Sequence, residues 1–185
     1  MCGRLNVIDD PLSRIVCEQL GIRFSTKTNH DLKPTQTAST VIASNDELQQ
    51  LDLPWGTKPS WSKRILINAQ AETANIKPTF SDAFSSARVV VPCSGWYEWA
   101  VINGKKQKLL FQSNHTPVLY MAGLALNNRS EVVTLTTTPT LEFAQYHHRM
   151  PLLLEENDVK TWLLGDKSQA KALAMKKTQV QPSVL

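Results

Sequence analysis

The pattern of apolar and polar positions predicts many short strands. Apolar residues form brief runs or alternate with polar ones, which is typical of strands rather than helices. Strands are expected at residues 40–44, 47–53, 65–67, 88–92, 95–99, 108–111, 118–126 and 132–137. The pair Asn103-Gly104 predicts a tight hairpin turn. Residues 29–37, which contain Pro34, are expected to form an extended loop.

Helical spacing is limited to a few short segments. Asp10 and Pro11 begin one helix, which is expected to end at Gly21. Further helices or helical turns are expected at residues 81–87, 141–146, 158–164 and 168–177, with Val159, Trp162, Leu163 and Leu173 covering one sheet face. The sequence therefore predicts an α+β fold in a single domain over residues 1–185, with a mainly antiparallel β-sheet or barrel-like core and a few short flanking helices.

Composition adds little about function. A chain of 185 residues can bury roughly 70% of its unfolded surface and needs no disulfide. Cys2, Cys17 and Cys93 are odd in number, lack zinc-type spacing and come without a secretory signal, so we expect a cytoplasmic protein with no metal and no cofactor. The net charge of +4 fits a polyanionic partner, but it is also common on ordinary soluble proteins.

Cys2 is the first candidate for chemistry. Initiator methionine is removed when the next side chain is small, which would leave Cys2 with an α-amine and a thiol on one carbon. Such a 1,2-aminothiol condenses with an aldehyde to a Schiff base and then closes through sulfur to a thiazolidine. The amine titrates near about 7.7–8.0 and the thiol near about 8.5, so modest tuning would give a neutral amine and a thiolate. The alternative is an ordinary residue on a frayed terminus.

A loop with two tryptophans is the second candidate. Trp55 and Trp61 alternate with Lys58, Lys63 and Arg64 in a segment rich in Pro and Gly. Aromatic rings beside basic groups can stack bases and track a phosphate backbone. Core tryptophans with solvated lysines beside them would explain the same residues, and the sequence leaves both interpretations open.

Glu98 lies in the aromatic run of residues 95–99. A carboxyl group in an apolar setting has a raised pKa and can carry protons near neutral pH. Strand alternation alone instead favours a surface-facing Glu98 between core aromatics.

Two other polar stretches are candidates. Asn68 directly follows an apolar run, where it marks either a site or a helix cap. His147 is suited to move protons at neutral pH, and Arg149 could hold a phosphate beside it. The adjacent His147 and His148 project differently, so we do not expect a metal pair.

Together these residues make the chain similar to the SRAP domain proteins, the abasic-site processing family whose members crosslink to abasic sites in single-stranded DNA. The shared features follow the family order and cover nearly the whole chain. They are Met1-Cys2-Gly3-Arg4, Pro34-Thr35-Gln36, Trp55-Gly56 with Pro59 and Trp61, Asn68-Ala69 with Ala71-Glu72-Thr73, Lys77-Pro78 with Phe80, Pro92 with Gly95-Trp96-Tyr97-Glu98-Trp99, and His147 with Arg149-Met150-Pro151.

The resemblance implies a catalytic role for each of four residues. Cys2, freed of Met1, would form the thiazolidine with the C1′ aldehyde of the abasic sugar. Glu98 would shuttle protons, and His147 would act as general acid and base in opening the sugar ring. Asn68 would hold the terminal cysteine or the sugar by hydrogen bonds.

The resemblance also implies a DNA surface. Arg4 and Arg149 would clamp the phosphates flanking the lesion and Trp61 would stack on a neighbouring base, with Lys63, Arg64 and Lys77 as further DNA-binding residues. The expected partner is single-stranded DNA with abasic sites, bound by a monomer that has no membrane association and is nucleoid-associated if the protein is bacterial. An associated lyase or self-processing peptidase activity is a further implication.

Three positions depart from the family pattern. Gln70 stands where the family usually has arginine, Asp31 where it usually has asparagine, and His148 where an aspartate is common. The first two changes remove a cation and add an anion, so DNA affinity or the path of the strand could change. The third could shift the pH dependence of ring opening.

Two other classes remain as alternatives. Glutamine amidotransferases of the N-terminal-nucleophile type also begin with Met-Cys-Gly, but their oxyanion motifs are not recognisable here, since the only Asn-Gly pair is read as a hairpin turn. A non-catalytic DNA-binding module would need only the basic tryptophan loop.

Overall fold

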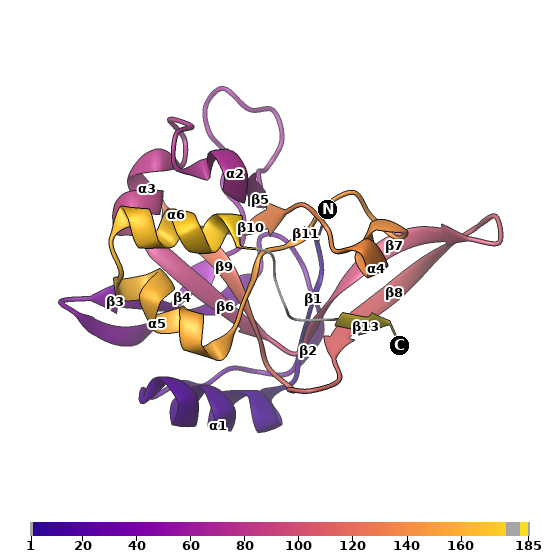
Figure 1. Cartoon of the computed structure of the whole chain (residues 1–185), viewed down its shortest axis with the longest axis horizontal. Helices are drawn as coiled ribbons and strands as arrows, with labels where there is room; N and C mark the ends of the chain where they lie inside the picture. Colours follow the sequence, from indigo (N-terminus) through magenta and orange to yellow (C-terminus); the bar gives the residue numbers. More distant parts are fainter. Residues whose placement is uncertain (1, 177–181, 185) are drawn as a thin grey trace.

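The computed structural model describes residues 2–176 and 182–184, which form two sheets flanked by short helices (Figure 1). The larger sheet has strand order β11-β10-β9-β6-β3-β4, with β12 beside β9 and β5 beside β10. Its strands are β3 (Thr37–Ser44), β4 (Glu47–Pro54), β5 (Asn68–Gln70), β6 (Arg88–Cys93), β9 (Leu119–Leu126), β10 (Glu131–Thr137), β11 (Met150–Pro151) and β12 (Leu153–Leu154). Every residue of β6 and β9 is buried, which explains their continuous apolar sequences.

The smaller sheet has strand order β13-β8-β7-β1-β2. Its strands are β1 (Leu5–Val7), β2 (Asn29–Leu32), β7 (Gly95–Ile102), β8 (Lys105–Ser113) and β13 (Pro182–Val184). The hairpin of β7 and β8 extends away from the rest of the molecule, to the right in Figure 1. Asn103 and Gly104 both have positive φ at its tip, as the predicted turn requires.

Ser94 joins the two sheets. It is the single residue between β6 and β7, so the chain passes there from one sheet into the other. Its backbone N–H donates to the carbonyl oxygen of Asn6 (2.8 Å), and its hydroxyl accepts from the N–H of Ile8 (3.0 Å). Because Ser94 is buried, these bonds fix the crossing point beside the N-terminal strand β1.

Six helices among the described residues flank the sheets. They are α1 (Asp9–Leu20), α2 (Ala71–Ala74), α3 (Ser81–Ser86), α4 (Leu141–Ala144), α5 (Glu156–Leu164) and α6 (Lys167–Met175). Gly21, with a φ of 71°, ends α1 in the left-handed conformation. Leu12, Val16 and Leu20 of α1 are buried, as their helical spacing predicts.

A buried arginine on β6 anchors two helices. The Arg88 guanidinium donates to the carbonyl oxygens of Phe84 (2.8 Å) in α3 and of Trp162 (2.5 Å) in α5, and it also bonds Gly165. The last carbonyls of a helix have no partner within the helix, so one cation satisfies acceptors at two helix ends. The indole of Trp162 donates in turn to the carbonyl of Val89 (2.9 Å), which seats α5 against β6.

The α+β prediction is confirmed, and the described strands form two sheets rather than a closed barrel. The expected strands and helices are present, with ends that differ by a few residues and with two exceptions. Residues 29–32 form β2 instead of a loop, because they pair with β1. Residues 65–67 lie outside any strand, apart from a single bridge between Leu66 and Thr57. The expected helix end at residue 177 lies outside the described residues.

Helix α5 covers the larger sheet as predicted, whereas α6 packs mainly against α5 and α2. Val159, Trp162 and Leu163 of α5 are buried against the sheet, and Leu173 of α6 is partly buried. Within the described part of the chain, no helix combines the length and apolar character needed to cross a bilayer.

Replacing Arg88 by methionine should lower the free energy of unfolding by about 2–4 kcal/mol, since several buried carbonyls lose a charged donor. Urea denaturation measures this. The matched control is Arg14→Met: Arg14 pairs with Glu18 on the exposed face of α1, and its loss should cost less than about 0.5 kcal/mol. Equal effects of the two substitutions would contradict the anchoring role of Arg88.

Candidate active site

The N-terminal segment is held along the edge of β7. Leu5 pairs with Trp96, and the N–H of Tyr97 donates to the carbonyl of Arg4 (3.0 Å), so the contact with β7 reaches to within two residues of Cys2. The Cys2 side chain is only 1% exposed and its sulfur lies 3.9 Å from the Arg4 carbonyl oxygen. Cys2 is therefore a buried residue with defined contacts, and the alternative of a frayed terminus does not apply to it.

Asn68 joins Cys2 to the other sheet. Its side-chain amide donates to the backbone carbonyl of Cys2 (2.9 Å). Its carbonyl oxygen accepts from the hydroxyl of Thr134 (2.5 Å), a buried residue directly opposite Asn68 in the parallel pair of β5 and β10. Because both ends of the amide are engaged, its orientation is set before any ligand binds. Thr134 was not predicted; its only signal was a hydroxyl within a buried apolar strand.

Glu98 points into the protein. Along β7, Trp96, Glu98 and Ala100 are buried, whereas Tyr97 and Trp99 are partly exposed on the opposite face. The surface-facing position that alternation alone favoured is wrong, since the aromatic residues occupy both faces of the strand. Burial raises the pKa of Glu98 above its ordinary value, so this carboxyl holds its proton to higher pH than an exposed glutamate.

Cys2 and Glu98 influence each other electrostatically. Burial raises the pKa of the Cys2 thiol well above its ordinary value, and the negative charge of Glu98 raises it further. The environment therefore does not produce the thiolate expected from modest tuning. Cys93, also buried, has its pKa raised to about 12 by burial and stays a thiol at neutral pH.

Four aromatic rings hold the segment that carries His147 over the same face of β7. Phe143 of α4 lies 5.7 Å from Trp96 and 4.8 Å from Phe111 between ring centroids, and Tyr146 lies 5.3 Å from Phe111. Trp96 stacks on Phe111 at 5.3 Å. His147 directly follows Tyr146, so this cluster brings it to the side of the sheet where Glu98 is buried.

His147 is held by its own loop. Its Nδ1 lies 3.0 Å from the backbone nitrogen of Arg149, and its ring stacks on His148 at 4.3 Å. Burial lowers the pKa of His147, and charge on His148 lowers it further, although the contact with the Arg149 backbone acts in the opposite direction. The imidazole is therefore neutral near pH 7 and can accept a proton.

Arg149 makes a forked ion pair with Glu72. Its Nη1 and Nη2 lie 2.9 and 2.7 Å from the two carboxylate oxygens, and Nη2 also donates to the carbonyl of Thr136 (2.5 Å). Burial opposes ionisation of Glu72, but the bonds from Arg149 bring its pKa below the ordinary value. Glu72 is the second residue after the end of β5. The ion pair therefore connects the His147 loop to the strand that carries Asn68. A phosphate contact of Arg149 stays a prediction.

The two tryptophans of the basic loop separate. Trp55 is 1% exposed and donates its indole N–H to the carbonyl of Ile67 (3.0 Å), so it belongs to the core. Trp61 is 67% exposed, and Lys63 and Arg64 beside it are exposed as well. Lys77 is also exposed on the adjoining segment. Stacking by Trp61 remains a prediction that its exposure permits.

Trp61 borders a hollow of about 630 Å³. Its lining includes Pro78, Asp82 and Arg129, but not Cys2, Asn68, Glu98 or His147. This hollow is therefore distinct from the candidate active site.

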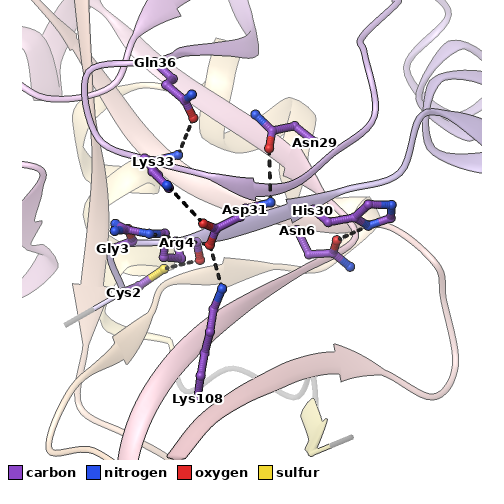
Figure 2. A network of polar contacts seen from close by, with 10 residues as sticks. All are labelled: Cys2, Gly3, Arg4, Asn6, Asn29, His30, Asp31, Lys33, Gln36 and Lys108. Atoms are coloured by element: carbon purple, nitrogen blue, oxygen red, sulfur yellow. Dashed lines mark hydrogen bonds and ion pairs between the residues drawn. The ribbon is translucent and has the colours of Figure 1, made fainter.

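Arg4 and Asp31 lie next to each other. The Nε of Arg4 is 3.5 Å from Asp31, which also contacts two lysines that were not predicted as site residues, Lys33 (3.5 Å) and Lys108 (2.6 Å) (Figure 2). Lys108 ends the polar run of residues 105–108 that begins β8, and nothing in this run marks a contact with Asp31. Among the described residues, no group of three or more His, Cys, Asp or Glu side chains is placed to hold a metal ion.

Two relatives found by comparison with known proteins have the same description, abasic site processing protein. "Abasic site processing protein YoqW" of Bacillus subtilis is 28% identical over 179 residues, which cover 88% of this chain and 80% of that protein. "Abasic site processing protein YedK" of Escherichia coli is 26% identical over 131 residues, covering 66% and 59%. A phage-related protein of Bordetella bronchiseptica shares the fold, with a TM-score of 0.80, 22% identity and coverage of 100% and 94%.

The sequence profile of one family matches residues 1–183 and is described as "SOS response associated peptidase (SRAP)". Because this match spans nearly the whole chain, the protein belongs to the SRAP family.

Proposed function

We propose that this protein captures abasic sites in single-stranded DNA by forming a covalent thiazolidine through Cys2 after removal of Met1. Membership of the SRAP family and relatives named abasic site processing proteins support this function. The observation that carries the proposal is the fixed position of Cys2. Asn68 holds its carbonyl, and the buried carboxyl of Glu98 is close enough to raise the pKa of its thiol.

The reaction needs an aldehyde first. The abasic sugar is mainly a closed hemiacetal. Neutral His147 takes the proton of its C1′ hydroxyl as the ring C–O bond breaks, and the imidazolium then returns this proton to the released O4′. The freed Cys2 amine then attacks the C1′ carbon of the aldehyde. Loss of water from this adduct gives a protonated imine. The sulfur finally attacks the imine carbon, the C=N electron pair moves to the nitrogen, which keeps its proton, and the five-membered ring closes.

Glu98 is suited to move the protons in these steps. A protonated Glu98 gives its proton to the departing hydroxyl during imine formation. The resulting carboxylate then accepts the proton of the Cys2 thiol as sulfur attacks the imine. Since burial raises the pKa of both groups, the thiol proton is delivered within the pocket at the moment of ring closure.

DNA enters by contacts outside this pocket. Trp61, Lys63, Arg64 and Lys77 are exposed and can stack on bases or bind phosphates. An abasic nucleotide has no base to unstack, so it reaches a narrow site at little cost. We place this activity in a cytoplasmic monomer, where the adduct shields the lesion. The imine also allows strand cleavage by β-elimination when ring closure fails.

The intact mass of the purified protein should show that Met1 has been removed. Mixed with single-stranded DNA that carries one abasic site, the protein should then give a heat-stable adduct on a denaturing gel. Cys2→Ala should give none. Cys2→Ser keeps the amine and should form only an imine that borohydride traps. Cys17→Ala is the matched control, because Cys17 lies on α1 and should not affect crosslinking. An adduct from Cys2→Ala would refute the proposal.

Glu98→Gln keeps the shape of the side chain but removes its proton exchange, and His147→Ala removes the base for ring opening. Each should slow crosslinking about a hundredfold or more. Binding to intact single strands, followed by fluorescence anisotropy, should stay within about twofold of the wild type, since these groups do not hold the DNA. Equal loss of binding and crosslinking would instead assign both residues to DNA binding.

His148→Asp tests the role of His147 through pH. Protonation removes the neutral base, so crosslinking declines as pH falls through the pKa of His147, which lies below its ordinary value. A neighbouring carboxylate stabilises the imidazolium and raises that pKa, so the decline should move to higher pH. Rates between about pH 5 and 8 measure this. His148→Asn, which removes the charge without adding an anion, should lie between the other two profiles.

A further inference from the structure

Asp31 lies among three basic side chains at the exposed edge of the smaller sheet. Lys108 approaches one carboxylate oxygen at 2.6 Å and Arg4 approaches the same oxygen at 3.5 Å. Lys33 lies 3.5 Å from the other oxygen. We call Arg4, Lys33 and Lys108 the basic cluster. Three cations facing one carboxylate leave an excess of positive charge, more than a structural ion pair would need (Figure 2).

Strand register places the cluster on one face of the sheet. Leu5 and Leu32 are paired and buried, so Arg4, Asp31 and Lys33 next to them project to the other side. Lys108 pairs with Trp99, which is partly exposed on the outward face of β7. The face that carries the basic cluster is therefore the reverse of the face where Glu98 is buried.

The backbone beneath the cluster is already ordered. The N–H of Asp31 donates to the side chain of Asn29 (3.1 Å), and the N–H of Lys33 donates to the side chain of Gln36 (2.7 Å). Lys108 lies 4.0 Å above the ring of Tyr97, and Arg4 lies 5.8 Å from the ring of Trp99. Charged groups and aromatic faces are thus combined as in a surface that binds single-stranded nucleic acid.

The contacts to Asp31 are exchangeable. The side chains of Arg4, Asp31, Lys108 and Lys33 are 30%, 39%, 37% and 53% exposed, and ion pairs this open to water contribute little stability. The hydrogen bond from Lys108, with the charges of Lys108 and Lys33, lowers the pKa of Asp31. Asp31 therefore stays anionic at neutral pH and offers the cluster the same kind of oxygen ligand that a phosphate offers.

The cluster is next to the reactive residue. Arg4 is two residues from Cys2, a stretch that spans at most about 7 Å of extended chain. A phosphate neighbouring an abasic sugar at Cys2 is therefore within about two residue lengths of Arg4.

We propose that Arg4, Lys33 and Lys108 form a subsite for a DNA phosphodiester group, and that Asp31 is its resident counter-anion, which the DNA backbone displaces. This inference rests on the proposed function and adds two lysines and a competing carboxylate to its DNA surface. Because Asp31 must be displaced first, the affinity for single-stranded DNA is lower, whether or not the DNA contains an abasic site. The covalent step at Cys2 supplies retention only where an aldehyde is present. A resident anion therefore favours release from intact DNA without preventing capture of the lesion.

The test measures affinity for an intact single-stranded oligonucleotide, which cannot crosslink. Asp31→Asn should tighten binding about two- to fivefold at low salt, the range of an exposed ion pair. The plot of log affinity against log salt should become steeper by up to about 0.7, the slope of one phosphate contact. Lys108→Gln should weaken binding by a similar factor and make the plot shallower. In Asp31→Asn, removal of Lys108 should cost more than it does in the wild type.

Matched controls have the same charge changes elsewhere. Lys106→Gln lies on β8 two residues from Lys108, and Asp46→Asn lies in the exposed turn between β3 and β4. Neither should change affinity more than about 1.5-fold. Melting temperatures identify any variant that is affected through folding.

Affinity of Asp31→Asn equal to or weaker than that of Asp46→Asn would overturn the inference, as would equal effects of Lys108→Gln and Lys106→Gln. Crosslinking to abasic DNA is measured separately on the same proteins. Normal crosslinking with unchanged affinities would leave the proposed function intact and reject the subsite. If the affinities change as expected but no crosslink forms, the subsite is supported and the proposed crosslinking function is rejected.

Discussion

The site depends on the backbone pairing that holds residues 4–6 against β7. These main-chain hydrogen bonds, which do not depend on side chains, fix the chain directly after Cys2. Asn68 then adds one hydrogen bond from the other sheet to the Cys2 carbonyl. An N-terminal residue normally loses much conformational freedom when it binds a ligand. Here folding has already removed that freedom, so reaction at the terminus starts from a positioned group.

One strand separates the two tasks of the proposed function. The inward residues of β7 include Glu98, which shares a low-dielectric pocket with Cys2, so that a negative charge on either group disfavours ionisation of the other. The outward residues Tyr97 and Trp99 lie beneath Lys108 and Arg4. The proposed proton transfer at Glu98 is therefore separated by the sheet from the salt-exposed outer face, where we propose that phosphates bind. The two-residue period of a strand is sufficient to produce this division.

Most elements follow from local patterns. The apolar runs at β6 and β9, the turn at Asn103-Gly104 and the helical spacing of α1 all gave correct predictions, since each signal is contained within a few residues. Strand β2 was missed because its polar sequence carries no alternation and its structure comes from pairing with β1. Pairing partners lie far apart in sequence, so no local pattern encodes them.

The candidate site shows the same difference between local sequence signals and contacts between distant residues. Cys2, Asn68, Glu98 and His147 were singled out by residue type and by family resemblance, but the burial of Glu98 contradicted its alternation pattern. Aromatic residues on both faces of β7 make apolarity uninformative about which face is inside. The partners Thr134, Glu72 and Lys108 were not assigned roles, because their contacts join strands and loops that the sequence does not place side by side.

The anchoring of α3 and α5 by Arg88 restricts substitution at position 88 more than at the helix ends that accept its hydrogen bonds. Every acceptor in this arrangement is a main-chain carbonyl, which any amino acid provides. The bonds from Arg88 to the helix ends therefore do not depend on which side chains those ends carry, although the buried rings of Phe84 and Trp162 still pack in the core. Position 88 itself is restricted, because only the planar, many-donor guanidinium reaches two helix ends at once, and the single ammonium of a lysine would have to leave one of them.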